Sequence, residues 1–150
     1  MAKKIHETYQ QSTTASDAIY RVARHLRQKI ANYFKQAQVD LSPEQWRFLL
    51  QLAEKNGSRQ AEFADPVLND RPNITRIIDG LEKRGLLARA SAPGDRRSTL
   101  VHLTPGGKEL INTHVPEVID EISICFEGLD ERDVSELKRI MAIIEANLKQ

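Results

Sequence analysis

The chain has 150 residues and a net charge of +1, with 40% of its residues hydrophobic and 29% charged. This is the composition of one globular domain that is large enough to bury a core without disulfide bonds or structural metals. No apolar run approaches the roughly 20 residues of a transmembrane helix. The only cysteine, Cys125, excludes an internal disulfide and a multi-cysteine metal site. No apolar run follows the two lysines near the N-terminus, so we expect no secretory signal, a cytoplasmic location and no membrane partner.

The charge is distributed unevenly along the chain. Residues 1–41 and residues 71–97 each carry seven Lys or Arg against three Asp or Glu, a net charge of +4 in each segment. Residues 42–70 carry three against five, and residues 105–150 carry five against ten. A basic middle segment is therefore attached to an acidic C-terminal segment, and the middle segment is the candidate surface for a polyanion.

Two amphipathic helices are predicted in the first part of the chain. Apolar residues recur at spacings of three and four, which predicts a long first helix over about residues 14–38. The stretch SPEQ, beginning at Ser42, is typical of a capping box with proline at the first helical position. We expect this second helix to end near Gly57, because glycine accepts the left-handed conformation that closes helices.

A connector and a further helix are predicted next. Residues 59–69 are expected to form a short helix that Pro66 ends. Asp70 is a good N-cap for the following helix, DRPNITRIIDGLEKRGL, whose apolar residues fall at i, i+3, i+4 and i+7. Its opposite face carries side chains able to form hydrogen bonds: Arg71, Asn73, Thr75, Arg76, Asp79 and Lys83.

After this helix the apolar period changes from about 3.6 to about 2, which indicates strands. Residues 86–90 and 99–103 are predicted to form a β-hairpin, joined by a loop over residues 91–98 that carries Arg96 and Arg97.

Two helices are predicted to close the chain. Thr104 and Pro105 begin one that reaches about residue 128, and Asp130 caps the last one. The apolar stripe of the last helix is wider than one neighbouring helix can cover, which predicts a homodimer.

A helix with a polar face followed by a hairpin is typical of a winged helix-turn-helix, in which the helix enters the DNA major groove. Reading base edges requires hydrogen-bonding side chains near the start of that helix, such as Asn73 and Thr75. Binding phosphates requires cations, which the hairpin supplies. Each of these side chains alone is also typical of a solvated surface, so the prediction of double-stranded DNA as partner depends on their combination. The predicted DNA-binding residues are Arg71, Asn73, Thr75, Arg76, Lys83, Arg96 and Arg97.

Two stretches, ITRIIDGLEKRGLL and DRRSTLVHLTPGGKEL, resemble the recognition helix and the wing of the MarR family of bacterial transcriptional regulators. The second stretch carries the family's Asp-x-Arg signature at Asp95 and Arg97, and the resemblance covers essentially the whole chain. It implies a fold that is mainly α with a small β-hairpin, as a single MarR-like domain. Its implied parts are a winged helix-turn-helix DNA-binding part over about residues 42–104 and a helical dimerisation region over about residues 10–38 and 105–150.

The resemblance also implies roles for individual residues. Arg97 is expected to enter the minor groove with Asp95 orienting it, while Thr75 and Arg76 face the major groove. The family often binds small phenolic or other aromatic effectors near the junction of its two parts, and Thr75 and Arg89 match positions implicated in aromatic-carboxylate binding in one member. We therefore expect a homodimeric, sequence-specific repressor of a palindromic operator, released by a small-molecule effector.

Other functions are weighed against this one. The four histidines lack metal-binding spacing, and no nucleophile with a base or phosphate-binding loop is present, so we expect no metal, no cofactor and no enzymatic activity. Cys125 is expected to be a small core residue near the dimer interface. Two alternatives stay open: a thiol-based redox-sensing regulator that uses Cys125, and a protein-interaction module on the winged-helix scaffold.

Overall fold

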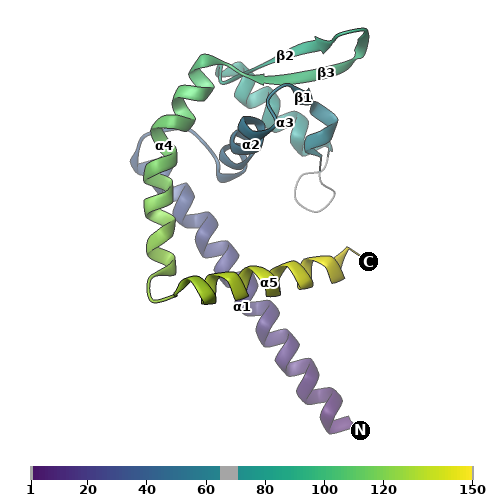
Figure 1. Cartoon of the computed structure of the whole chain (residues 1–150), viewed down its shortest axis with the longest axis vertical. Helices are drawn as coiled ribbons and strands as arrows, with labels where there is room; N and C mark the ends of the chain where they lie inside the picture. Colours follow the sequence, from purple (N-terminus) through teal and green to yellow (C-terminus); the bar gives the residue numbers. More distant parts are fainter. Residues whose placement is uncertain (1, 65–70, 150) are drawn as a thin grey trace.

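The structure is a computed structural model that describes residues 2–64 and 71–149; for residues 2–13, 71, 96 and 97 it describes the backbone alone. Figure 1 shows α2, α3 and the small sheet grouped at one end of the molecule, with α4 leading from the sheet toward α5. In chain order the elements are α1 (Ala2–Gln36), α2 (Pro43–Glu54), β1 (Ser58–Arg59), the 3-10 helix η1 (Gln60–Phe63), α3 (Arg71–Lys83), β2 (Leu87–Ala92), β3 (Asp95–Leu103), α4 (Pro105–Ser123), the 3-10 helix η2 (Ile124–Phe126) and α5 (Glu131–Leu148).

The helix starts predicted at Ser42, Thr104 and Asp130 are confirmed. Ser42 accepts a hydrogen bond on its Oγ from the backbone N–H of Gln45 (3.2 Å), and Gln45 Oε1 accepts one from the backbone N–H of Ser42 (3.0 Å). Thr104 Oγ1 accepts from the backbone N–H of Gly107 (3.0 Å), and Asp130 caps the first turn of α5. These bonds satisfy backbone donors that have no partner inside the helix, so the chain is held at the start of α2, α4 and α5.

The core lies within the grouped end of the molecule. The four apolar residues of the predicted α3 stripe, Ile74, Ile77, Ile78 and Leu81, are all buried, which confirms the predicted face. Phe34 of α1 enters the same core beside Trp46 of α2, with ring centroids 5.2 Å apart. The side chains with almost no exposed surface come from α1, α2, α3, β2 and β3: Phe34, Phe48, Leu49, Leu52, Ile74, Ile78, Leu81, Leu87 and Val101.

The predicted hairpin is longer than expected. Strand β2 continues to Ala92 and β3 begins at Asp95, so the turn is tight and contains Gly94, whose φ is +76°. Arg96 and Arg97 therefore lie within β3 and not in a loop. Pairing with β2 extends β3 beyond residues 99–103, the stretch from which the strand was predicted.

The predicted hairpin is confirmed by the pairing of β2 with β3, and a third strand that was not predicted joins it in an antiparallel sheet with the order β1–β3–β2. Strand β1 has only two residues, paired with Val101 and Leu100 of β3. Two residues are too few to show an alternating pattern of apolar and polar side chains. Their extended conformation depends on the backbone pairing with β3.

The predicted helix over residues 59–69 is wrong in its first part. Residue 59 belongs to β1, and the turn that follows is the 3-10 helix η1, ending at Phe63. Phe63 is buried against Phe48 with ring centroids 5.0 Å apart, so a tertiary contact fixes this turn. Pro66 and the predicted N-cap Asp70 lie outside the described residues.

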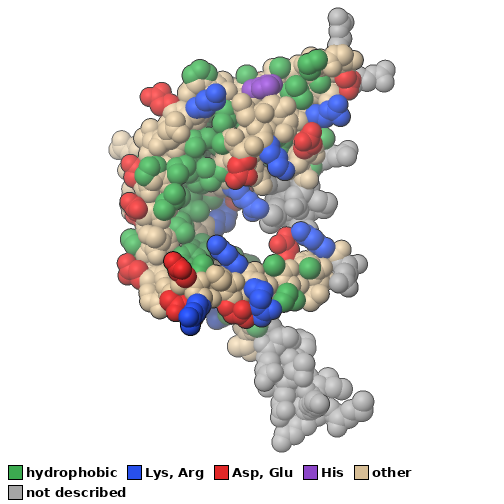
Figure 2. Space-filling view, in the orientation of Figure 1, with side chains coloured by type: hydrophobic (Ala, Val, Ile, Leu, Met, Phe, Trp, Pro, Cys, Tyr) green, Lys and Arg blue, Asp and Glu red, His purple; other side chains and the backbone are tan. Residues whose placement is uncertain are grey.

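The terminal helices carry apolar surface that the chain itself does not cover. No residue of α5 is buried, although Ile140 and Ile143 lie on it, and Ile119 on α4 is 59% exposed. Figure 2 shows apolar side chains gathered along α4. Cys125 is exposed in η2, which corrects the expectation that it belongs to the core of the chain.

α1 begins earlier than predicted and α4 ends earlier. The first residues of α1 contain few apolar residues, so their sequence gives no amphipathic signal. In the described part of the chain, no helix has the length and apolar character that spanning a bilayer requires.

Candidate nucleic-acid interface

Helix α3 divides into an apolar face and a polar face. The apolar face is buried in the core, and Thr75, Arg76 and Lys83 remain exposed, while Asn73 is half-buried. Arg76 Nη2 donates a hydrogen bond to Asn73 Oδ1 at 2.9 Å, so these two side chains are held together near the start of the helix. Arg71 is the first residue of α3, and its side chain lies outside the described part. The predicted base-reading residues therefore all lie in the first two turns of α3, with Asn73 and Arg76 bonded to each other and Thr75 on the side that faces Gln60.

Strand β3 carries the predicted wing residues. Asp95 is exposed at the start of the strand, with Arg96 and Arg97 directly after it. The side chains of both arginines lie outside the described residues, so the expected contact between Asp95 and Arg97 stays a prediction.

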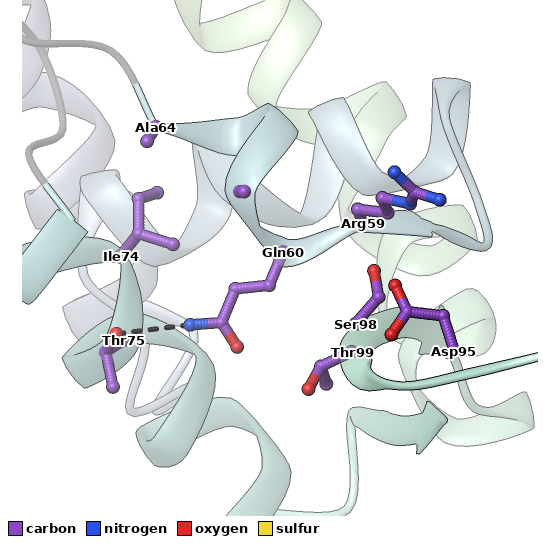
Figure 3. Close-up of a pocket in the computed structure, with 9 residues that line it drawn as sticks. Arg59, Gln60, Ala64, Ile74, Thr75, Asp95, Ser98 and Thr99 are labelled. Carbon is purple, nitrogen blue, oxygen red and sulfur yellow. Dashed lines mark hydrogen bonds between the residues drawn. The ribbon is translucent and has the colours of Figure 1, made fainter. Parts of the chain in front are cut away.

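A polar hollow of about 530 Å³ separates α3 from the wing strand (Figure 3). Thr75 enters it from α3, Asp95 and Ser98 from β3, and Arg59 and Gln60 from β1 and η1. Sequence analysis did not single out Arg59 or Gln60. Their position beside the hollow follows from the pairing of Arg59 with Leu100, which no local sequence pattern predicts.

Arg89 on β2 joins the wing to α3. Its Nη1 donates to Glu82 Oε2 and its Nη2 to Asp79 Oδ1, both at 2.5 Å. Its Nε donates to Gln60 Oε1 at 3.3 Å, and Gln60 Nε2 donates to Thr75 Oγ1 at 3.1 Å. The predicted effector residues Thr75 and Arg89 are thus connected through Gln60.

The environment of Arg89 keeps it ionised. Burial alone would lower the pKa of its guanidinium, but the hydrogen bonds to Asp79 and Glu82 outweigh burial and raise the pKa. The guanidinium already has two carboxylate partners, so an anionic ligand binding to Arg89 would compete with both.

A second hollow, of about 590 Å³, lies where α1 and α4 meet α2; we call it the junction hollow. Its lining is mainly apolar, and Arg27, whose Nε donates to Glu44 Oε1 at 2.6 Å, contributes a cation. The residues that line it are Ala23, Arg27, Ile30, Pro43, Glu44, Trp46, Arg47, Leu50 and Val118.

Beside the junction hollow, α1 is bonded to α4. The Tyr33 hydroxyl lies 2.7 Å from His114 Nδ1 and donates to Glu117 Oε2 at 3.2 Å. Burial, followed by the nearby Glu117 carboxylate, raises the pKa of Tyr33 above 10.

The remaining candidate chemistry is sparse. Within residues 2–64 and 71–149, no three His, Cys, Asp or Glu side chains are grouped so as to hold a metal ion. The Cys125 thiol lies 3.7 Å from the backbone carbonyl oxygen of Glu121.

A helix-turn-helix joined to a wing, with a polar helix face beside that wing, defines a DNA-binding transcription regulator of the winged helix-turn-helix class. Comparison with known proteins gives the family. The MarR family profile matches residues 41–99. MhqR, an HTH-type transcriptional regulator of Bacillus subtilis (strain 168), is 30% identical over 110 residues, which are 73% of this chain and 76% of MhqR. The chain therefore belongs to the MarR family, a family of transcription regulators and not of enzymes.

Two solved structures show the same fold in regulators with known partners. The transcriptional repressor CouR, bound to a 23-mer DNA duplex, is 28% identical with a TM-score of 0.74, covering 85% of this chain and 89% of that chain. BpsR of Bordetella bronchiseptica, whose DNA binding is regulated by 6-hydroxynicotinic acid, is 25% identical with a TM-score of 0.68, covering 85% and 98%. Proteins of this fold thus include a repressor and a regulator that responds to an aromatic acid.

Proposed function

We propose that this chain is a homodimeric, sequence-specific repressor that a small aromatic effector releases from a palindromic operator. The observation that carries the proposal is the division of α3, whose apolar stripe is buried while Thr75 and Arg76 remain exposed beside the basic strand β3. A helix held in this way presents hydrogen-bonding side chains to base edges in a major groove. CouR, which has the same fold, is a repressor bound to DNA.

Within this proposal each side chain has a separate task. Asn73, Thr75 and Arg76 read base edges, and Arg97, oriented by Asp95, enters the neighbouring minor groove. The phosphate contacts come from Arg71, Lys83 and Arg96. Arg59 adds one more, because the hollow that it lines lies between the two reading elements, where the DNA backbone separating the grooves would pass.

The DNA-binding proposal is tested by selecting duplexes from a randomised library and measuring Kd for the selected and the scrambled duplex by fluorescence anisotropy. We expect the selected duplex to bind at least about 10³-fold more tightly in physiological salt. Arg76→Ala should lose about 1–3 kcal/mol on the selected duplex and relax its preference. Equal affinity for both duplexes in the wild type would contradict the proposal and favour the protein-interaction alternative.

The division of labour in the proposed dimer follows the two ends of the chain. Residues 42–104 form the DNA-reading part, and residues 10–38 and 105–150 form the dimerisation part. The uncovered apolar residues of α4 and α5 support this assignment, since a second copy would cover them. A two-fold dimer would read half-sites about 34–36 Å apart. Because its partner is chromosomal DNA, we place the protein in the cytoplasm.

The junction hollow is the proposed effector site. It has the apolar lining that a small aromatic acid requires and, in Arg47, a cation outside the Arg27–Glu44 ion pair, and it contacts both the reading part and the dimerisation part. BpsR is regulated by such an acid. Thr75 and Arg89 are the second candidate position, where a ligand would displace the carboxylates of Asp79 and Glu82.

Trp46, the only tryptophan of the chain, lines the junction hollow and provides a direct readout. We expect aromatic carboxylates, with 6-hydroxynicotinic acid as the first probe, to change its fluorescence and to raise the thermal midpoint by mass action. Leu50→Phe, which narrows the hollow and leaves Trp46 the only tryptophan, should weaken binding strongly, whereas Arg89→Lys should weaken it only if the second position is the site. Absence of binding by every acid, phenol and quinone tested would contradict the effector proposal.

The thiol-based alternative is favoured by one observation, the exposure of Cys125. If the thiol is the sensor, peroxide should release the operator from the wild type and leave the Cys125→Ser complex intact. Equal release from both proteins, or release from neither, would exclude it.

A further inference from the structure

We propose that Arg89 is a positioning residue, which fixes the recognition helix α3 against the wing strand β2 and so sets the geometry between the two DNA-reading elements. The inference rests on the proposed function, because it concerns how α3 and the wing act together on one duplex. It gives Arg89 a role that requires no contact with DNA or effector.

The side chain of Arg89 is held on three sides. Its Nη1 and Nη2 reach Glu82 and Asp79 at 2.5 Å, its Nε reaches Gln60 at 3.3 Å, and its backbone N–H also donates to Glu82, at 3.1 Å. The side chain is only 24% exposed. A planar guanidinium that donates in three directions has a fixed orientation, so the two carboxylates fix where α3 stands over β2.

The contacts return to α3 at a second point. Gln60, which accepts from Arg89, donates through Nε2 to Thr75 Oγ1 at 3.1 Å. Thr75, Asp79 and Glu82 are four and three residues apart and therefore share one face of the helix. A helix bonded at both ends of a stretch of about 10 Å cannot rotate or slide without breaking hydrogen bonds.

Apolar packing alone would hold α3 less specifically. Ile78 and Leu81 bury the adjoining side of the helix, but burial has no directional preference and tolerates small rotations. The short connection to β2 passes through Gly85, which has a φ of +68° and no atom within 4 Å of the position a Cβ would take. Arg89 and Gln60 thus supply directional contacts between α3 and the wing.

Two other roles for Arg89 must be separated from positioning. The guanidinium could neutralise Asp79 and Glu82, which would otherwise repel phosphates. It could also bind a phosphate directly. If Arg89 acts by neutralisation, removing the charges of Arg89, Asp79 and Glu82 together restores the affinity for the operator. If Arg89 binds a phosphate, Arg89→Ala lowers the salt dependence of Kd.

The experiment compares Kd for the selected operator and for a scrambled duplex of equal length at several salt concentrations. The variants are Arg89→Ala, Arg89→Lys and the triple variant Arg89→Ala/Asp79→Asn/Glu82→Gln, each first checked for folding by circular dichroism. We expect Arg89→Ala to lose about tenfold on the operator, the effect of one mismatched base pair, and to stay within about threefold on the scrambled duplex. The salt slope should not change, the triple variant should match Arg89→Ala, and Arg89→Lys should lose less.

Three outcomes overturn the proposal. Full operator affinity in the triple variant identifies charge neutralisation, equal losses on both duplexes with a reduced salt slope identify a phosphate contact, and an unchanged preference in Arg89→Ala shows that no positioning is needed. If Arg89→Ala does not fold, the same measurements are made on Arg89→Lys and Gln60→Ala. Gln60→Ala removes the hydrogen bond to Thr75 and leaves both ion pairs of Arg89 in place. Failure of the wild type to prefer any duplex would instead refute the proposed function, before any variant is measured.

Discussion

Arg59 lines the hollow between α3 and β3; its backbone N–H donates to Glu62 Oε1 at 3.3 Å, and among the described residues its guanidinium forms no salt bridge with a carboxylate. If the DNA backbone crosses this hollow, Arg59→Ala should lower the slope of log Kobs against log salt by about 1 per subunit, with little change in the preferred sequence. Arg59→Lys should retain the slope because it retains the charge. Arg132→Ala on α5 is the control arginine outside the proposed interface, and a slope for Arg59→Ala equal to that of this control would refute the contact.

Tyr33 gives the junction of α1 and α4 a pH dependence whose sign can be worked out. Its pKa is raised above 10 in the folded chain, first by burial and then by Glu117, so folding favours the neutral hydroxyl. The stabilisation is complete below the unfolded-state pKa and is lost as the pH rises through the folded-state pKa. In urea unfolding between about pH 9 and pH 11.5, the wild type should lose more free energy of unfolding than Tyr33→Phe. Parallel curves for the two proteins would contradict this assignment.

Two adjacent glycines at the start of α4 provide a test at the scale of the element. A Cβ at Gly107 would lie 2.0 Å from the carbonyl oxygen of Leu86, whereas a Cβ at Gly106 would find its nearest atom at 3.7 Å. Gly107→Ala must therefore move α4 away from the sheet and should cost about 1–3 kcal/mol or more. Gly106→Ala should be neutral or slightly stabilising, since alanine is the better helix former. Thermal and urea unfolding measure both, and equal stabilities would mean that α4 does not approach Leu86 so closely.

The elements differ in how far sequence alone predicts them, for physical reasons. α2 and α3 are predictable because their signals are local: a capping box at Ser42, and an apolar stripe that begins at Ile74. β1 is not, because its two residues become a strand only by pairing with β3. The same limit applies to the site. The polar face of α3 follows from its own periodicity, but the partners of Arg89 lie 7, 10 and 29 residues away, and the tertiary fold alone brings them together.

At the scale of the whole molecule, side chains of both α1 and α4 enter the core of the reading part. Phe34 of α1 is buried in the reading part, and Tyr33 beside it bonds to His114 of α4. The junction hollow opens next to these contacts. A ligand that fills it would therefore act on α1, α2 and α4 together, which is how occupancy could change the separation of two recognition helices in a dimer.

The dimer itself is tested on α5. Ile143 is 48% exposed, and a second copy that covers it would not tolerate a buried carboxylate. Ile143→Glu should therefore shift the protein from about 34 kDa, twice the 17.0 kDa chain, to the monomer mass in size-exclusion chromatography with light scattering. Because the two half-sites would then be bound separately, affinity for the palindrome should fall by about 10²–10⁴ while affinity for a single half-site stays constant. Ser135→Glu introduces the same charge at an exposed polar position of α5, more than two turns from Ile143, and should remain dimeric. A dimeric Ile143→Glu protein with wild-type operator affinity would show that α5 does not form the interface.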